Sequence, residues 1–194
     1  MTSRDLAARD DDRLALLDQI KDKAVVHGRV VLSSGREADW YVDLRRITLD
    51  SAAAPLVGRV MLDATAGLDY DAVGGLTLGA DPVATAMLHA AAAAGRRLDA
   101  FVVRKEGKAH GLQRMVEGPV ESGTKVLVVE DTVTTGGSTI AAIEQIREQG
   151  LDIVGGVCVV DRLAGGAEAI ADAIGGPFEA LVTIDDVYPE RPDR

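Results

Sequence analysis

Few aromatic residues and a single cysteine set the first limits on this chain. Aromatic residues make up only 3% of its 194 residues although 47% are hydrophobic, so we expect a core built mainly from aliphatic side chains. The single cysteine, Cys158, excludes an internal disulfide and a cysteine-based zinc site. It lies in the apolar stretch 157–160, which predicts a buried and unreactive thiol.

Long apolar segments are lacking too. No apolar run reaches about 18 residues, and the residues that follow Met1 are polar and charged. We therefore expect neither a membrane-spanning helix nor a signal peptide, and we predict that the protein works in the reducing cytoplasm.

Positive charge is scarce as well, since 21 lysines and arginines face 31 aspartates and glutamates, and the formal net charge is −10. Proteins that bind nucleic acids or anionic membranes normally carry a basic surplus. We therefore expect no nucleic-acid partner and no membrane partner. The length is typical of one domain, and we expect residues 1–194 to form it.

Short apolar runs alternate with helical patterns along most of the chain. The spacing predicts strands at 71–76, 99–104, 124–131, 152–161 and 178–186. It predicts helices at about 10–26, 54–67, 81–95, 138–150 and 165–176, with Asp81 as the N-cap of the third. Continuous apolar strands separated by helices are typical of an α/β fold, a mostly parallel sheet covered on both faces. Ligands bind such sheets beyond the carboxyl ends of the strands.

The stretch KVLVVEDTVTTGGSTIAAIEQI, residues 125–146, joins a predicted strand to a predicted helix. Backbone N–H groups at a helix start are unpaired, and glycines let a ligand approach them, so this loop has the composition of a phosphate site. Its hydroxyl donors are Thr134, Thr135, Ser138 and Thr139. Glu130 and Asp131 are acceptors that suit vicinal hydroxyls rather than a phosphate. The loop therefore predicts a sugar-phosphate ligand such as ribose 5-phosphate.

The alternative for this loop is an ordinary helix start capped by Ser138, with both acids exposed to solvent. Two better-known phosphate motifs are not found. Residues 118–125 place threonine and lysine in the wrong order for a P-loop and precede a strand, and the chain has no G-x-G-x-x-G.

A basic segment follows the predicted strand at 99–104. Residues 96–114 hold six lysines and arginines and two acids, so their local charge is +4 in a chain of −10. A long, glycine-punctuated basic loop suggests a mobile lid that closes on a polyanion such as pyrophosphate. The alternative is a solvated basic surface.

A further arginine, Arg162, follows the predicted strand at 152–161. Its guanidinium could bind a carboxylate through two parallel hydrogen bonds. Pairing with nearby acids is an equally good alternative.

These motifs resemble those of a known family. VVEDTVTTGGS, residues 128–138, is similar to the phosphoribosyl pyrophosphate (PRPP) motif of type I phosphoribosyltransferases. The segment RKEGKAHG, residues 104–111, looks like the loop of the orotate phosphoribosyltransferases, and DRLAGG at 161–166 and GGLTLGADP at 74–82 fit the same family. The resemblance covers about residues 34–166.

The resemblance implies a type I phosphoribosyltransferase fold, with a small N-terminal hood formed by about 1–45 and a flexible lid loop. It implies transfer of the 5-phosphoribosyl group from PRPP to orotate, giving orotidine 5-monophosphate and pyrophosphate in pyrimidine biosynthesis. Magnesium would arrive with PRPP and be held mainly by substrate oxygens, without direct protein ligands. The chain would form a homodimer whose lid loop reaches into the neighbouring active site.

The resemblance also assigns roles to residues. Glu130 and Asp131 would bind the ribose hydroxyls. The 5-phosphate would be bound by Thr132, Val133, Thr134, Thr135, Gly136, Gly137 and Ser138. The pyrophosphate loop would be Thr77, Leu78, Gly79 and Ala80. Pyrophosphate would also be contacted by Arg104, Lys105, Lys108 and His110. Orotate would be bound by Thr134 and Arg162. The catalytic residues would be Lys108, His110 and Asp131.

The chain departs from the family pattern at two positions. Some members carry a lysine where this chain has Ser33, and another where it has Gly79; Arg36 is a candidate substitute for the first.

Two other functions remain open, a phosphoribosyltransferase for another base such as a purine or uracil, and a non-catalytic PRPP-binding regulator. The segment RKEGKAHG favours orotate.

Overall fold

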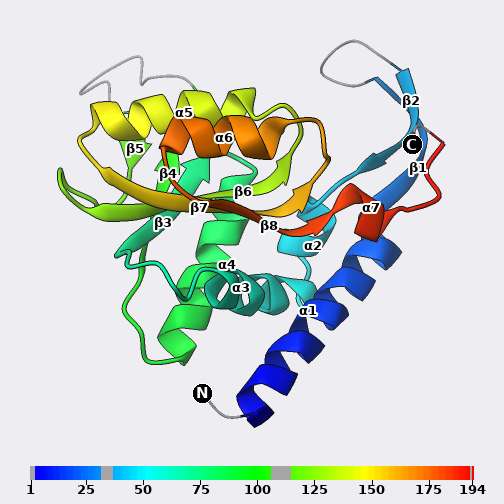
Figure 1. Ribbon diagram of the computed structural model, residues 1–194, viewed down its shortest axis with the longest axis horizontal. Helices are drawn as coiled ribbons and strands as arrows, with labels where there is room; N and C mark the ends of the chain where they lie inside the picture. Colours follow the sequence, from blue (N-terminus) through cyan, green and yellow to red (C-terminus); the bar gives the residue numbers. More distant parts are fainter. Residues whose placement is uncertain (1–2, 32–36, 106–114, 193) are drawn as a thin grey trace.

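A six-stranded sheet lies at the centre of the computed structural model, which describes residues 3–31, 37–105, 115–192 and 194 (Figure 1). The strand order is β5-β4-β3-β6-β7-β8. Five strands are parallel: β3 (Ala72–Leu76), β4 (Asp99–Val103), β6 (Lys125–Val133), β7 (Asp152–Asp161) and β8 (Phe178–Thr183). The two-residue strand β5 (Val116–Glu117) pairs antiparallel with β4. The predicted mostly parallel sheet is confirmed.

Helices cover both faces of the sheet, as Figure 1 shows. Helices α3 (Ala53–Ala64) and α4 (Ala80–Ala93) lie on one face, and α5 (Gly137–Glu148) and α6 (Gly166–Ile174) lie on the other. Successive residues of a strand point to opposite faces, so Leu127 is buried in the first core and Val126 and Val128 in the second. Cys158 is buried in the second core, as predicted, and burial raises the pKa of its thiol.

The strand order reverses direction between β3 and β6. From β3 the chain continues through α4 to β4 at one side, whereas from β6 it continues through α5 to β7 at the other side. The loops that leave β3 and β6 therefore diverge, and a crevice opens beyond the carboxyl ends of these two strands. In open α/β sheets this switch point is where ligands bind.

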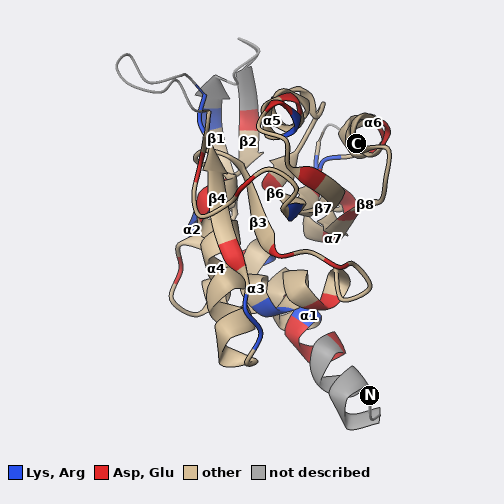
Figure 2. Cartoon of the chain, turned by 90° about the vertical axis from the view of Figure 1, so that its left-hand side faces the viewer, with Lys and Arg blue, Asp and Glu red and all other residues tan. Residues whose placement is uncertain are grey.

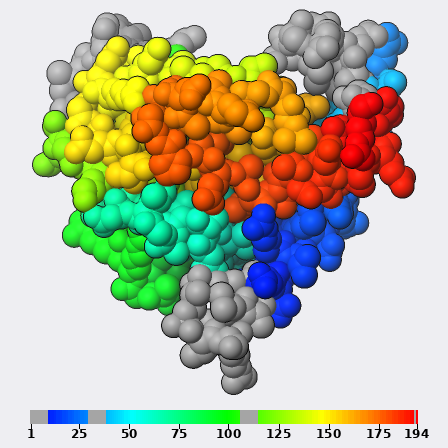
Figure 3. Space-filling model, viewed as in Figure 1, coloured from blue at the N-terminus to red at the C-terminus, as the bar shows by residue number. Residues whose placement is uncertain are grey.

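The hood is a separate antiparallel hairpin of β1 (Val25–Val31) and β2 (Glu37–Val42), which follows helix α1 (Ser3–Lys23). Trp40 of β2 is buried, and its ring meets the ring of Tyr188 edge-on at 5.2 Å between centroids. The ring of His27 on β1 contacts the same tyrosine at 5.6 Å. Tyr188 follows helix α7 (Ile184–Val187), so the C-terminal segment fastens the hood to the body of the molecule (Figures 1 and 3).

Several details of the sequence prediction are wrong. The N-cap of α4 is Gly79, not Asp81, whose carboxylate instead accepts a hydrogen bond from Thr77. The last predicted strand ends at Thr183, where a capping box starts α7. Helix α2 (Arg45–Thr48) directly follows the hood.

Within the described residues, no helix combines the length and apolar character needed to cross a membrane.

The close spacing of β3 and β4 predicts that Gly74→Ala destabilises the protein. A Cβ at Gly74 would lie 2.2 Å from the carbonyl oxygen of Phe101 on β4, so the strands must shift apart. We expect the free energy of unfolding, measured with urea, to fall by about 1–3 kcal/mol. The control is Gly67→Ala, because a Cβ at Gly67 would meet no atom within 4 Å. This variant should change the free energy of unfolding by less than about 0.5 kcal/mol. Equal effects of both substitutions would contradict this account.

Candidate active site

A cavity of about 460 Å³ lies at the switch point. Its described lining comes from the start of α2, from the loop after β3, from Lys105 and from the end of β6 through the start of α5. The lining residues are Val42, Asp43, Leu44, Arg45, Leu76, Thr77, Leu78, Gly79, Lys105 and every residue from Glu130 to Thr139. Most of the residues predicted to bind a sugar phosphate are therefore brought together.

One half of the cavity is suited to an anion. Helix α5 begins after Gly136, which has a left-handed φ of 79° and whose Cβ, if present, would lie 2.9 Å from the carbonyl oxygen of Gly166. No side chain caps this helix start, so the predicted alternative of a Ser138 cap is wrong. The N–H groups of the first turn are thus open to a ligand at the positive end of the helix dipole. The surrounding hydroxyls add donors.

The other half is acidic, with Glu130 buried and Asp131 partly buried. Glu130 is only 7% exposed, and its carboxylate accepts hydrogen bonds from the Thr139 hydroxyl at 3.1 Å and from the Asp131 backbone N–H at 3.1 Å. Asp131 accepts from the backbone N–H of Thr132 at 2.6 Å. Burial raises the pKa of Glu130 to about 8, and the charge of Asp131 adds to the rise. Burial also raises the pKa of Asp131.

The loop after β3 passes directly over these two acids. A Cβ at Gly79 would lie 2.5 Å from Oε1 of Glu130 and 2.8 Å from Oδ1 of Asp131. Thr77 of the same loop donates its hydroxyl to Asp81 at 2.6 Å, and the Thr77–Leu78 peptide bond is cis. Position 79 therefore has no room for a longer side chain unless the carboxylates move.

The remaining predicted site residues are not in the described lining of the cavity. Arg104 is outside the described lining of the cavity and lies 3.7 Å from Glu117 of β5. Arg162 is also outside that lining, and its guanidinium lies over the Trp40 ring at 5.3 Å from the centroid. Ala80 begins helix α4 and is buried. Lys108 and His110 fall outside the described residues, as do Ser33 and Arg36.

Asp43, Leu44 and Arg45 line the cavity although they were not among the predicted site residues. They come directly after β2, so a signal was present: charged side chains at the point where a strand ends. Nothing in the sequence shows that the hood hairpin ends beside the sheet, so this signal could not be connected with the site. Among the described lining residues, Arg45 and Lys105 are the cations.

Comparison with known proteins identifies the family. The pattern of the phosphoribosyl transferase domain matches residues 66–183. An orotate phosphoribosyltransferase of Streptomyces avermitilis is 67% identical over 178 residues, which cover 92% of this chain and 98% of that protein. This chain belongs to the orotate phosphoribosyltransferase family.

Solved structures of orotate phosphoribosyltransferases share the fold. The Mycobacterium tuberculosis enzyme in complex with Fe(III) dicitrate is 54% identical, with a TM-score of 0.82 over 91% of this chain and 99% of that one. The same enzyme in complex with PRPP is 48% identical, with a TM-score of 0.78 over 91% and 98%. The predicted type I phosphoribosyltransferase fold, a mostly parallel sheet flanked by helices, is confirmed.

The buried Glu130 predicts an unusual pH dependence of stability. Because its folded-state pKa lies above the ordinary value, the native state keeps a proton that the unfolded chain loses between about pH 4.5 and 8. Stability therefore falls as the pH rises through this window. Glu130→Gln cannot ionise, so we expect the stability of the wild type relative to this variant to drop by about 1 kcal/mol or more from pH 5 to pH 8, measured by urea unfolding.

Glu148→Gln is the control for this pH dependence, because Glu148 is exposed at the end of α5. It should follow the wild-type profile. Parallel profiles of the wild type and Glu130→Gln would contradict the assignment.

Proposed function

We infer that this protein transfers the 5-phosphoribosyl group of PRPP to orotate, giving orotidine 5-monophosphate and pyrophosphate in pyrimidine biosynthesis. One observation carries this conclusion: a single cavity joins an uncapped helix start to a pair of adjacent acids, one buried and one partly buried, in a chain 67% identical to an orotate phosphoribosyltransferase. A helix start binds a phosphate, and carboxylates accept hydrogen bonds from a sugar diol. The enzyme is a pentosyltransferase, and we place it in the cytoplasm.

PRPP fits the cavity in one direction. Its 5-phosphate lies against residues 132–138 at the start of α5, and its ribose hydroxyls donate to Glu130 and Asp131. Its pyrophosphate then extends toward Thr77, Leu78 and Gly79. Because Gly79 has no Cβ, the backbone of this loop can lie close to the two acids and to the ligand. Hydrogen bonds from the ribose stabilise the charged form of the carboxyls, so binding lowers their pKa and releases protons.

Magnesium arrives with PRPP in this proposal. Among the described residues, no group of three or more His, Cys, Asp or Glu side chains could hold a metal ion. Two adjacent carboxylates beside a phosphate site fit a cation that keeps mainly substrate oxygens and waters as ligands, as magnesium prefers. When bound, the ion neutralises charge on the pyrophosphate. The protein's own part is to orient the ribose through Asp131 and Glu130.

The reaction forms a bond from orotate N1 to C1 of the ribose and breaks the bond from C1 to the pyrophosphate oxygen, and the proton of N1 is released to solvent. The bonding electrons leave with pyrophosphate, and the transition state has oxocarbenium character. Orotate is held by Thr134 and by Arg162, whose guanidinium is positioned over Trp40. The protein contributes positioning and charge stabilisation rather than a nucleophile of its own.

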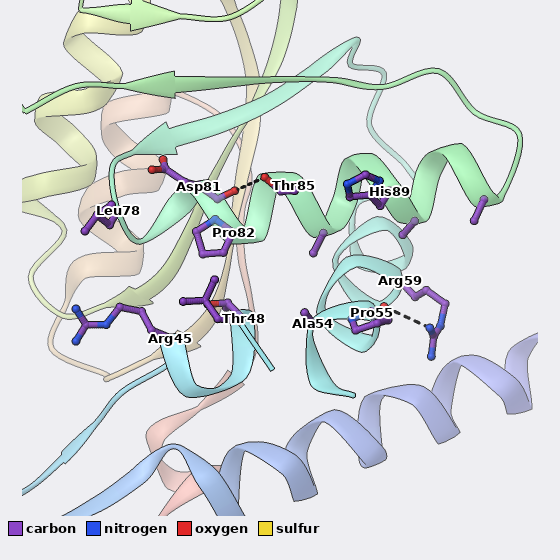
Figure 4. A pocket seen from close by; sticks show the side chains of 14 residues that line it. Arg45, Thr48, Ala54, Pro55, Arg59, Leu78, Asp81, Pro82, Thr85 and His89 are labelled. Atoms are coloured by element: carbon purple, nitrogen blue, oxygen red, sulfur yellow. Dashed lines mark hydrogen bonds between the residues drawn. The ribbon is translucent and has the colours of Figure 1, made fainter. Parts of the chain in front are cut away.

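We propose a homodimer in which the basic segment of one subunit reaches the active site of the other. An apolar groove of about 680 Å³ runs between α3 and α4, next to the loop after β3 (Figure 4). Helix α4 carries one charged residue, Asp81, and is nearly free of charge in Figure 2. Leu49 and Leu78 at this groove are 72% and 67% exposed. A second copy of the chain would bury these side chains next to the active site.

The first test of this function is an assay with orotate, PRPP and magnesium, followed by the absorbance of orotate. We expect turnover with orotate and none above background with uracil or a purine base. Turnover only with another base would favour a different phosphoribosyltransferase. Binding of PRPP without turnover of any base would favour a regulator.

The segment RKEGKAHG gives a second test. Lys108 and His110 are proposed to stabilise the leaving pyrophosphate, together with Arg104 and Lys105. We expect Lys108→Ala to lower kcat by about a hundredfold or more while the unfolding midpoint stays unchanged. Lys21→Ala, an exposed lysine of α1, is the control and should keep wild-type turnover.

Mixing variants tests whether the segment is shared across a dimer. Lys108→Ala and Asp131→Asn are each expected to lose most of their activity by this proposal. Subunit exchange between them creates sites with an intact Asp131 and an intact Lys108, so part of the activity should return. Near wild-type turnover of Lys108→Ala alone would contradict the role of the segment, and mixtures that stay inactive would contradict its sharing.

A further inference from the structure

Arg45 lies where the active-site cavity meets the groove between α3 and α4. It is the first residue of α2 and lines both hollows, as does Leu78 of the loop after β3. Figure 4 shows its side chain extending from the start of α2, on the same side of the groove as Leu78. Arg45 therefore lies where the cavity borders the loop after β3.

The charges around this end of the cavity require a cation. The described lining holds three acidic side chains, Asp43, Glu130 and Asp131, and a diphosphate brought beside their ionised forms would be repelled. Gly79 offers no charge, and a Cβ there would lie 2.5 Å from the Glu130 carboxylate. Lys105 directly precedes the residues outside the described part of the chain. Arg45 is thus the lining cation that belongs to the hood and α2 rather than to the basic segment.

Arg45 is held in place before any ligand binds. Its Nε donates to Oδ1 of Asp43 at 2.9 Å, and its backbone N–H donates to the same oxygen at 3.2 Å. The ion pair is more than half exposed on the arginine side, where 57% of the side chain is accessible. Because the bond to Asp43 uses Nε, the two Nη nitrogens keep donors for an anion.

Arg45 also acts on the acid that faces the ribose. Burial raises the pKa of Asp131, and the positive charge of Arg45 opposes that rise. The interaction is reciprocal. The pKa of Arg45 is raised, first by its hydrogen bond to Asp43 and further by the negative charge of Asp131. Arg45 and Asp131 line the same cavity, so a ligand that lies between them would face both.

We propose that Arg45 binds the diphosphate of PRPP, and the pyrophosphate product, through its Nη nitrogens while Asp43 holds it in position. It supplies fixed positive charge at the end of the cavity where Gly79 leaves no room for a side chain. The proposal rests on the proposed function for the identity of the natural ligand, but the binding of pyrophosphate can be measured without turnover.

The test compares Arg45→Ala and Arg45→Gln with Arg46→Ala in the intact protein. Arg46 is the next residue of α2, is exposed, and lies outside the described lining of the active-site cavity. The measurements are the KM for PRPP, the KM for orotate, and calorimetric titration with pyrophosphate in the presence of magnesium. We expect both Arg45 variants to raise the KM for PRPP and weaken pyrophosphate binding by about tenfold or more. The KM for orotate should stay within about twofold, and Arg46→Ala should match the wild type.

Two results would overturn the proposal. One is pyrophosphate affinity in both Arg45 variants equal to that of Arg46→Ala. The other is lowered activity that accompanies a changed oligomeric state in sedimentation while pyrophosphate affinity is kept, because Arg45 would then act at a subunit contact.

These measurements test the proposed function and the role of Arg45 separately. If the wild type binds pyrophosphate through Arg45 but does not convert orotate, the binding site stands and the proposed function falls. If the wild type converts orotate and the Arg45 variants bind pyrophosphate normally, only the role of Arg45 falls.

Discussion

Two neighbouring carboxyl groups lie at the switch point of the sheet, Glu130 buried and Asp131 partly buried, and the cost of withdrawing them from water constrains the elements around them. Burying a carboxylate is costly unless it is hydrogen-bonded or neutralised. Here α5 contributes the Thr139 hydroxyl, β6 contributes backbone N–H groups, and burial raises the pKa of both acids. Gly79 lets the loop after β3 close over them. The unliganded site is therefore prepared for groups that donate hydrogen bonds or carry positive charge.

This constraint explains how an acidic protein can hold a polyanion. The chain has a net charge of −10, yet in the proposed binding mode the negative groups of the cavity accept from hydroxyls and the uncapped start of α5 binds phosphate. Oriented N–H groups attract an anion without adding net charge. Positive side chains are then needed mainly where we propose that pyrophosphate binds, and Arg45 and Lys105 are lining residues of the cavity.

The sequence predicted the parts of this site that are continuous in the chain. Apolar runs located the five parallel strands, and the acids and hydroxyls of residues 130–138 share one loop, so composition was enough to find them. The role of Asp43 and Arg45 could not be predicted, because it depends on where the hood hairpin packs. That packing is set by contacts between distant residues, Trp40 and His27 with Tyr188. The two-residue strand β5 is too short to leave a periodic signal.

The scarcity of aromatic residues gives the hood contact a practical consequence. Trp40 is the single tryptophan of the chain, and it is packed between Tyr188 of the C-terminal segment and the guanidinium of Arg162. All tryptophan fluorescence therefore originates at the contact between the hood and the body, beside an arginine proposed to hold orotate. The protein carries a built-in optical reporter at this position, and its emission can be followed without labels and without engineered residues.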